Sequence, residues 1–217
     1  MVVALSDSGF FVSVEGLDGC GKTTQVGLLA QSLAAAGKNV AVVRDPGSTA
    51  LGERVRDLLL EPTTAPPISH WAETALFLAS RVQLAEEVIR PALAQGGVVV
   101  SDRYLDSTLV YQGARGIPWE EILELHRLCG LTRLPDLTLV LDLPVELARA
   151  RREAGGTPDR MEQEGSTYHE KVRAGYLKLA ERFPERVLLV NAQLPVAELA
   201  RECGELARER LNLERAI

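Results

Sequence analysis

A three-layer α/β fold, with a five-stranded parallel sheet covered by helices on both faces, is predicted by three observations. Short apolar segments alternate with helical patterns along the 217 residues. Each apolar segment is apolar at consecutive positions, as strands buried on both faces are. A glycine-rich turn joins the first apolar segment to the first helical pattern. Strand–helix alternation of this kind is typical of doubly wound domains.

Five strands are expected from runs rich in Val, Leu or Phe, at residues 10–15, 39–44, 98–102, 137–142 and 187–191. Helical patterns cover residues 22–36, 51–60, 71–94, 120–129, 145–152, 168–182 and 196–211. Gly37 ends the first helix, and Pro118 and Pro144 stand where helices begin. We expect one domain over residues 1–217, because neither a linker nor a repeat divides the chain.

One side of the helical pattern at 71–94 is apolar with the helical period, which predicts that this side packs in the core. Its members are Trp71, Ala75, Leu78, Val82, Ala85, Ile89 and Leu93.

Composition limits the classes of partner. Hydrophobic residues make up 46% and charged residues 25% of the chain, as in ordinary globular proteins. The net charge of -6 favours neither nucleic acid nor an anionic membrane as a partner. Cys20, Cys129 and Cys203 are far apart and form no C-x-x-C pair, so neither a disulfide framework nor a zinc site is expected. We find neither a signal-peptide pattern nor an apolar run that would span a bilayer, and we expect a soluble cytoplasmic protein.

The glycine-rich turn at residues 16–23 matches the P-loop motif G-x-x-x-x-G-K-[ST]. Its glycines let backbone N–H groups surround a phosphate, and the following helix N-terminus adds positive potential. Lys22 can reach the β- and γ-phosphate oxygens, and Thr23 can place its hydroxyl on Mg²⁺. The motif predicts a P-loop NTPase-type fold that binds a nucleoside triphosphate through nine residues. They are Gly16, Leu17, Asp18, Gly19, Cys20, Gly21, Lys22, Thr23 and Thr24.

Asp102 and Arg103 end the third expected strand. Ligands of parallel α/β sheets bind at the carboxyl ends of the strands, so both residues are expected near the P-loop. Asp102 can organise the metal ion, and Arg103 can hold a phosphate with its planar guanidinium. The alternative is a helix-capping Asp102 beside a surface Arg103; proximity to the P-loop favours the functional interpretation.

Phe77 and Arg81 are i,i+4 neighbours outside the apolar side of their helix. An aromatic ring and an arginine there can stack on a base and donate to its oxygen. Leu84 and Val88 share this side, however, and the pattern alone slightly favours a second packed face with a solvent-reaching Arg81.

Arginines end the helical pattern at 145–152 and continue into a Gly/Pro segment and Arg160. Arg149, Arg151, Arg152 and Arg160 can belong to a short lid, about residues 149–163, that closes over a phosphoryl group. The competing interpretation is a solvated, charged helix end, which is what most charge runs are.

With these residues established, the chain resembles bacterial thymidylate kinases over nearly its full length. The segments that carry the resemblance are FVSVEGLDGCGKTT at 11–24, RDPGST at 44–49, LGERVR at 51–56, ALFLASR at 75–81, DRY at 102–104, STLVYQG at 107–113, PDL at 135–137 and DRME at 159–162.

The resemblance implies an ATP- and Mg²⁺-dependent kinase that phosphorylates dTMP and forms a homodimer. It implies that Phe77 stacks on thymine, that Arg81 bonds a base oxygen, and that Tyr111 lies under the deoxyribose. Arg103 and an arginine of the 51–56 segment, for which we choose Arg54, would hold the acceptor phosphate. Asp45, Thr108 and Gln112 complete the acceptor site, and Thr23, Asp18 and Asp102 lie near the metal. Lid arginines replace the arginine that some family members carry within the P-loop.

Two positions depart from the family pattern Glu-Pro-Gly-Gly-Thr. Asp45 keeps a carboxylate with a shorter reach, which puts its contact role in question. Ser48 stands where the family has a glycine. The open question is whether the backbone at this position requires a conformation that only glycine adopts easily.

Phosphate oxygens are both nucleophile and leaving group in this transfer, so Lys22, Asp18, Arg103, Mg²⁺ and the lid arginines would act by positioning and charge neutralisation. The isolated His70, His126 and His169 are interpreted as ordinary surface or packed residues. Another nucleoside-monophosphate or deoxynucleoside kinase is the nearest alternative. A P-loop GTPase switch lacks its D-x-x-G and N-K-x-D sequences here, and a binding-only relative would not consume ATP.

Overall fold

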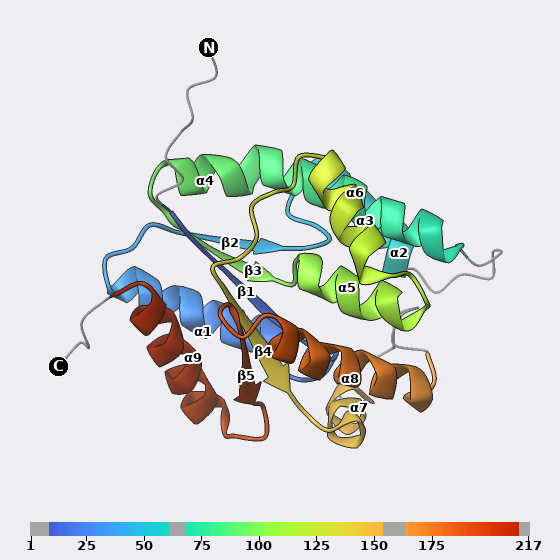
Figure 1. The fold of residues 1–217 in the computed structure, drawn as a ribbon. Coiled ribbons are helices and arrows are strands. Elements are labelled where there is room, and N and C mark those ends of the chain that lie inside the picture. Colours follow the sequence, from blue (N-terminus) through green and yellow to red (C-terminus); the bar gives the residue numbers. More distant parts are fainter. Residues whose placement is uncertain (1–8, 61–67, 154–163, 213–217) are drawn as a thin grey trace, which may run out of the picture.

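The computed structural model describes residues 9–60, 68–153 and 164–212 (Figure 1). Its sheet has five parallel strands in the order β2-β3-β1-β4-β5. The strands are β1 (Phe10–Gly16), β2 (Val40–Arg44), β3 (Val98–Asp102), β4 (Leu137–Asp142) and β5 (Val187–Asn191). The predicted sheet is therefore confirmed, and its strand bounds differ from the prediction by one residue at most.

Helices cover both faces of the sheet, with α1 (Lys22–Ala35) and α9 (Val196–Arg210) side by side on one of them (Figure 1). On the other, α5 (Leu105–Ala114) packs against α8 (Ser166–Arg182). The remaining helices are α2 (Ala50–Leu60), α3 (His70–Leu84), α4 (Arg90–Ala94), α6 (Trp119–Leu128) and α7 (Val145–Glu153). The result is the three-layer arrangement that the sequence predicts.

The central strands β1 and β3 are buried at every position, whereas the edge strands β2 and β5 expose Val42 and Leu189. The main hydrophobic cluster joins the sheet to the helices on both faces, and a second, small cluster contains Leu78, Ala85 and Leu131. None of the helices in the described ranges is long and apolar enough to cross a membrane.

The predicted helix at 71–94 is divided by a π-helical turn, η1 (Ala85–Ile89), between α3 and α4. Ile89 and Leu93 are buried as predicted, but Trp71 is 48% exposed and Ala75 is also exposed. The prediction that the whole apolar side is core was thus wrong at its start, because the first turns of α3 project beyond the sheet.

Helix α5 was not predicted. Residues Leu105 to Gln112 are all buried, including the polar Asp106, Ser107 and Thr108, so the segment has no solvated side. The amphipathic pattern by which a surface helix is recognised is therefore missing.

Candidate active site

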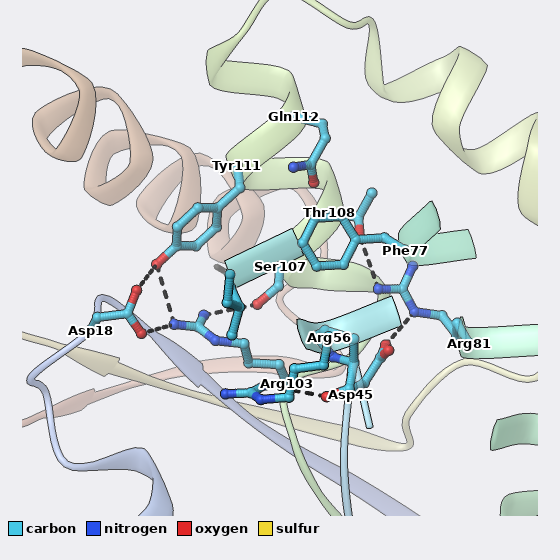
Figure 2. A pocket seen from close by; sticks show the side chains of 12 residues that line it. Asp18, Asp45, Arg56, Phe77, Arg81, Arg103, Ser107, Thr108, Tyr111 and Gln112 are labelled. Atoms are coloured by element: carbon cyan, nitrogen blue, oxygen red, sulfur yellow. Dashed lines mark hydrogen bonds and ion pairs between the residues drawn. The ribbon is translucent and has the colours of Figure 1, made fainter. Parts of the chain in front are cut away.

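Two adjoining pockets open at the carboxyl ends of the strands. The loop pocket is lined by Gly19, Gly21, Lys22, Thr23, Thr24 and residues of neighbouring strands and helices. The inner pocket lies between β1, β2, α2, α3 and α5 and includes Phe77, Arg81, Thr108, Tyr111 and Gln112 (Figure 2). Both pockets share Asp18, Arg56 and Arg103. The P-loop and the end of β3 therefore face the same space, as the sequence predicted.

The P-loop conformation depends on its glycines. Gly19 and Gly21 have φ angles of 86° and 96°, in the region that favours glycine. A Cβ on Gly19 would lie 2.2 Å from the backbone oxygen of Ala148 in α7, so the loop packs directly on that helix. The side chains of Leu17 and Cys20 are buried beneath the loop and do not line the pocket. These two residues can therefore contribute to phosphate binding only through their backbone groups.

Lys22 lies within the loop it is expected to serve. Its side chain is only 7% exposed, and Nζ donates to the backbone oxygen of Leu17 at 2.9 Å and to Asp18 at 3.4 Å. The ammonium is thereby held at the floor of the loop pocket, where a bound phosphate would meet it.

Asp18 and Arg103 form an ion pair where the two pockets meet (Figure 2). Arg103 also donates to Ser107 and to the backbone oxygen of Gly16, both at 3.0 Å, and its guanidinium lies 5.1 Å from the centre of the Tyr111 ring. Burial raises the pKa of Asp18, but the Arg103 and Lys22 cations outweigh this effect and hold the pKa well below its usual range. Arg103 has φ 68°, a left-handed conformation that is costly for a residue with a Cβ.

Thr23 and Asp102, two of the residues predicted to lie near a metal ion, are in hydrogen-bond contact. The Thr23 hydroxyl donates to Asp102 Oδ2 at 2.7 Å, and both residues line the loop pocket. Within the described residues, no group of three or more His, Cys, Asp or Glu side chains gathers around a metal position. Two oxygen ligands beside a phosphate pocket still suit Mg²⁺, which takes few protein ligands and keeps waters and phosphate oxygens.

Arg81 is buried, not solvent-reaching. Its side chain is 1% exposed and pairs with Asp45 at the end of β2, and Thr108 accepts from it at 2.8 Å (Figure 2). Phe77 lies beside it in the pocket wall. The pattern alone had favoured a second packed face with Arg81 in solvent, and this prediction was wrong because a buried carboxylate offsets the cost of burying the guanidinium.

The other predicted acceptor residues are placed in the same wall. Gln112 is 1% exposed and donates to Glu73 at 3.0 Å. The Tyr111 hydroxyl lies 3.3 Å from both Asp18 and Arg103. Tyr111 therefore lines the inner pocket next to Asp18 and Arg103, two of the residues that both pockets share.

Arg54 does not reach either pocket. Its side chain is exposed, whereas Arg56 is half-buried, lines both pockets and donates to the backbone oxygen of Pro46 at 3.2 Å. Two residues that are two positions apart on a helix point about 200° apart, so only one of them can face the site. Of the two arginines, Arg56 and not the predicted Arg54 faces the pockets.

Of the predicted lid arginines, Arg151 lines the loop pocket, and its Nη1 donates to the backbone oxygen of Ala192 at 3.1 Å. Arg149 and Arg152 lie on the same helix without lining either pocket. Arg160 and most of the predicted lid, residues 154–163, lie outside the described residues.

The departures at Asp45 and Ser48 have structural consequences. Asp45 is used to pair Arg81, while its Oδ1 is buried without a hydrogen-bond partner. Ser48 has φ 62°, so the position does favour glycine. Its side chain compensates locally, because Ser48 Oγ accepts from the backbone N–H of Arg44 at 2.8 Å.

Glu15, fully buried at the end of β1, was not among the predicted site residues. It accepts from Ser107 at 2.5 Å, from Tyr176 at 3.0 Å and from the backbone N–H of Tyr104 at 2.7 Å. Since Ser107 also accepts from Arg103, Glu15 supports the position of that arginine through it. Burial and the nearby Asp106 raise the pKa of Glu15 to about 7.

Replacing Glu15 should therefore change the pH dependence of stability. The pKa of Glu15 is about 7 in the folded protein and about 4.5 in an ordinary glutamate, so between these two pH values the folded protein binds one proton more than the unfolded chain. Stability from this group is fully present below about pH 4.5 and is lost as the pH rises to about 7. We expect the free energy of unfolding of the native chain, relative to Glu15→Gln, to fall by up to about 3 kcal/mol from pH 5 to pH 8. Urea unfolding at several pH values measures this difference, and parallel curves for the two proteins would contradict it.

A P-loop beside a second pocket, with Asp18, Arg56 and Arg103 shared between them, is the arrangement of a nucleotide kinase, that is, a phosphotransferase. The family model described as "Thymidylate kinase" matches residues 14–203. A thymidylate kinase of Deinococcus radiodurans is 45% identical over 205 residues, which cover 93% of this chain and 98% of that protein. One of Pseudomonas syringae pv. tomato is 44% identical and covers 96% and 99%, respectively. The crystal structure of thymidylate kinase from Ehrlichia chaffeensis has a TM-score of 0.73 at 30% identity, covering 92% of this chain and 98% of that one. The chain belongs to the thymidylate kinase family.

Proposed function

We propose that this chain transfers the γ-phosphoryl group of ATP to the phosphate of dTMP, giving ADP and dTDP for dTTP synthesis. The observation that carries the proposal is the pair of pockets joined at Asp18, Arg56 and Arg103. The loop pocket would take the ATP phosphates and the inner pocket the nucleoside of dTMP, so that the two phosphate groups meet at the shared residues.

The inner pocket offers an aromatic face and a fixed guanidinium to a base. Phe77 would stack on thymine, and Arg81 would donate to a base oxygen. Tyr111 and Gln112 would close the sugar side, where a tyrosine ring leaves little room for a 2′-hydroxyl. Thr108 acts on the base indirectly, since its hydroxyl holds Arg81.

The phosphate end works by charge. Lys22, Arg56 and Arg103 would neutralise the two substrates, whose repulsion is the main barrier to bringing them together. Asp18 would hold Arg103 toward the acceptor phosphate and not serve as a metal ligand, because both of its oxygens are already in contact with cations or Tyr111. Thr23 and Asp102 would hold Mg²⁺, which when bound neutralises phosphate charge.

The P-loop and α7 touch at Gly19, so a lid that begins in α7 can move together with the loop. Arg151 already lines the loop pocket, and we assign lid arginines, including Arg149, Arg152 and Arg160, to the charge of the transferring group. One domain with such a lid, in a reducing cytoplasm that suits the three free cysteines, completes the proposal.

A homodimer is supported by an apolar surface over α2, α3 and α6. Leu51, Leu58, Trp71 and Leu128 are each at least 44% exposed on these helices. Large apolar side chains exposed on neighbouring helices are candidates for a protein–protein interface. Sedimentation of the purified chain at micromolar concentration would test the proposal.

The function is tested by coupled ADP release with dTMP, dUMP, dCMP, UMP and thymidine as acceptors. We expect the highest kcat/KM with dTMP and dependence on added Mg²⁺. ATP consumption that no acceptor accelerates would contradict the proposed reaction. A preference for thymidine over dTMP would instead indicate a deoxynucleoside kinase.

Arg56 and Arg54 form a matched pair for the acceptor-phosphate role. Arg56→Ala should raise the KM for dTMP at least about tenfold, because a charged hydrogen bond to a phosphate is worth about 1.5–3 kcal/mol. Arg54→Ala removes the same charge from the exposed face of the same helix and should leave this KM within about twofold. Steady-state kinetics at saturating ATP give both values, and equal effects would refute the assignment.

A further inference from the structure

The guanidinium of Arg81 is held on several sides at once. Nε donates to Asp45, Nη2 donates to Thr108 at 2.8 Å and to the backbone oxygen of Tyr104 at 3.3 Å, and Nη1 lies 2.6 Å from Nε2 of His126. A guanidinium has five N–H donors. These contacts use four of them and leave one N–H on Nη1 for a ligand in the inner pocket, which Arg81 lines.

His126 comes from α6, and none of the residues that line the inner pocket belongs to this helix. Its side chain is 2% exposed, and Nδ1 lies 2.7 Å from the backbone oxygen of Ile122. A carbonyl oxygen can only accept, so Nδ1 carries the hydrogen and Nε2 has a lone pair for Arg81. Burial, followed by the Arg81 charge, lowers the pKa of His126 to about 3, which agrees with a neutral ring.

We propose that His126 is a positioning residue for dTMP: through Nε2 it fixes the Arg81 N–H that reads the base. The inference rests on the proposed role of Arg81 in base binding. His126 itself does not line the pocket, so it acts on the nucleotide only through the arginine.

The position of the Arg81 Nη1 group depends on His126. Asp45 and Thr108 hold the Nε and Nη2 sides, but within the described residues His126 is the only protein group in hydrogen-bond contact with Nη1. Without this acceptor both Nη1 hydrogens lack a protein partner in a buried wall, which favours tilting of the guanidinium. A neutral acceptor also adds no charge beside the Asp45–Arg81 pair.

The test compares His126→Leu, which removes the acceptor, with His126→Gln, whose Oε1 can take the place of Nε2. The expected result is a rise of about tenfold or more in the KM and Kd for dTMP in His126→Leu, with the KM for ATP within about twofold. His126→Gln should recover most of the dTMP affinity. The exposed His70→Leu is the matched control, expected to match the native chain.

Arg81→Ala separates this inference from the proposed function. If Arg81→Ala leaves dTMP binding unchanged, the base-reading role itself fails. If Arg81→Ala weakens dTMP binding and His126→Leu does not, only the positioning role fails. In the double variant, His126→Leu should add nothing to Arg81→Ala; an additive loss would show a separate effect of His126 and overturn the proposal. Should His126→Leu not fold, dTMP binding by His126→Gln and by a His126→Phe variant decides: equal affinity in both would also overturn it.

Discussion

Lys22→Ala is expected to lower kcat by about 10³-fold or more, equivalent to about 4 kcal/mol of transition-state stabilisation. Lys22 Nζ is held by Leu17 and Asp18 at the floor of the loop pocket, so its charge is in place before the substrate binds. Such preorganised charge stabilises the transferring phosphoryl without a cost of reorganisation. Steady-state turnover at saturating ATP and dTMP measures the loss.

Two controls make this result specific. Lys171→Ala removes an exposed lysine from α8 and should keep native turnover. The unfolding temperature of Lys22→Ala should stay within a few degrees of that of the native chain, because the hydrogen bonds of Lys22 are to Leu17 and Asp18 of the P-loop itself. Near-native kcat in a folded Lys22→Ala protein would end the assignment of the loop as the ATP site.

The strands were predictable because burial on both faces leaves a run of consecutive apolar residues, and strand β1 leads directly into a loop whose residue types are dictated by phosphate binding. Helix α5 was missed for the opposite reason. Its polar residues point into a buried site and not into water, so they interrupt the pattern by which a helix is recognised.

The same logic separates the site residues that were predicted from those that were not. Phe77 and Arg81 were recognised by resemblance, whereas spacing alone favoured the wrong surroundings for Arg81. Arg56 and Glu15 needed three-dimensional information: the orientation of α2 decides between Arg54 and Arg56, and Glu15 matters through Ser107, which is far away in the sequence. Spacing reports which residues share a helix side, but not what that side meets.

Arg103→Ala is expected to lower kcat/KM for dTMP by about 10³-fold or more. The guanidinium lies at the junction of the pockets, where the acceptor phosphate would meet the phosphoryl group of ATP. Arg103→Lys should recover only part of the activity, because a single ammonium cannot reproduce a planar, two-pronged contact with phosphate. Initial rates across dTMP concentrations measure the loss, and Arg54→Ala is the arginine control on the exposed surface.

A second substitution at Arg103 measures how much the left-handed backbone conformation at this position costs a residue with a Cβ. With φ 68°, the residue occupies a conformation that costs about 1 kcal/mol for any residue with a Cβ and little for glycine. Arg103→Gly and Arg103→Ala lose the same guanidinium, and both should be inactive, yet the glycine variant should be more stable by about 1 kcal/mol in urea unfolding. If the alanine variant is instead equally stable, the backbone at this position is unstrained. The expected order would show that the backbone at the end of β3 is held in a costly conformation, at the residue whose side chain lines both pockets.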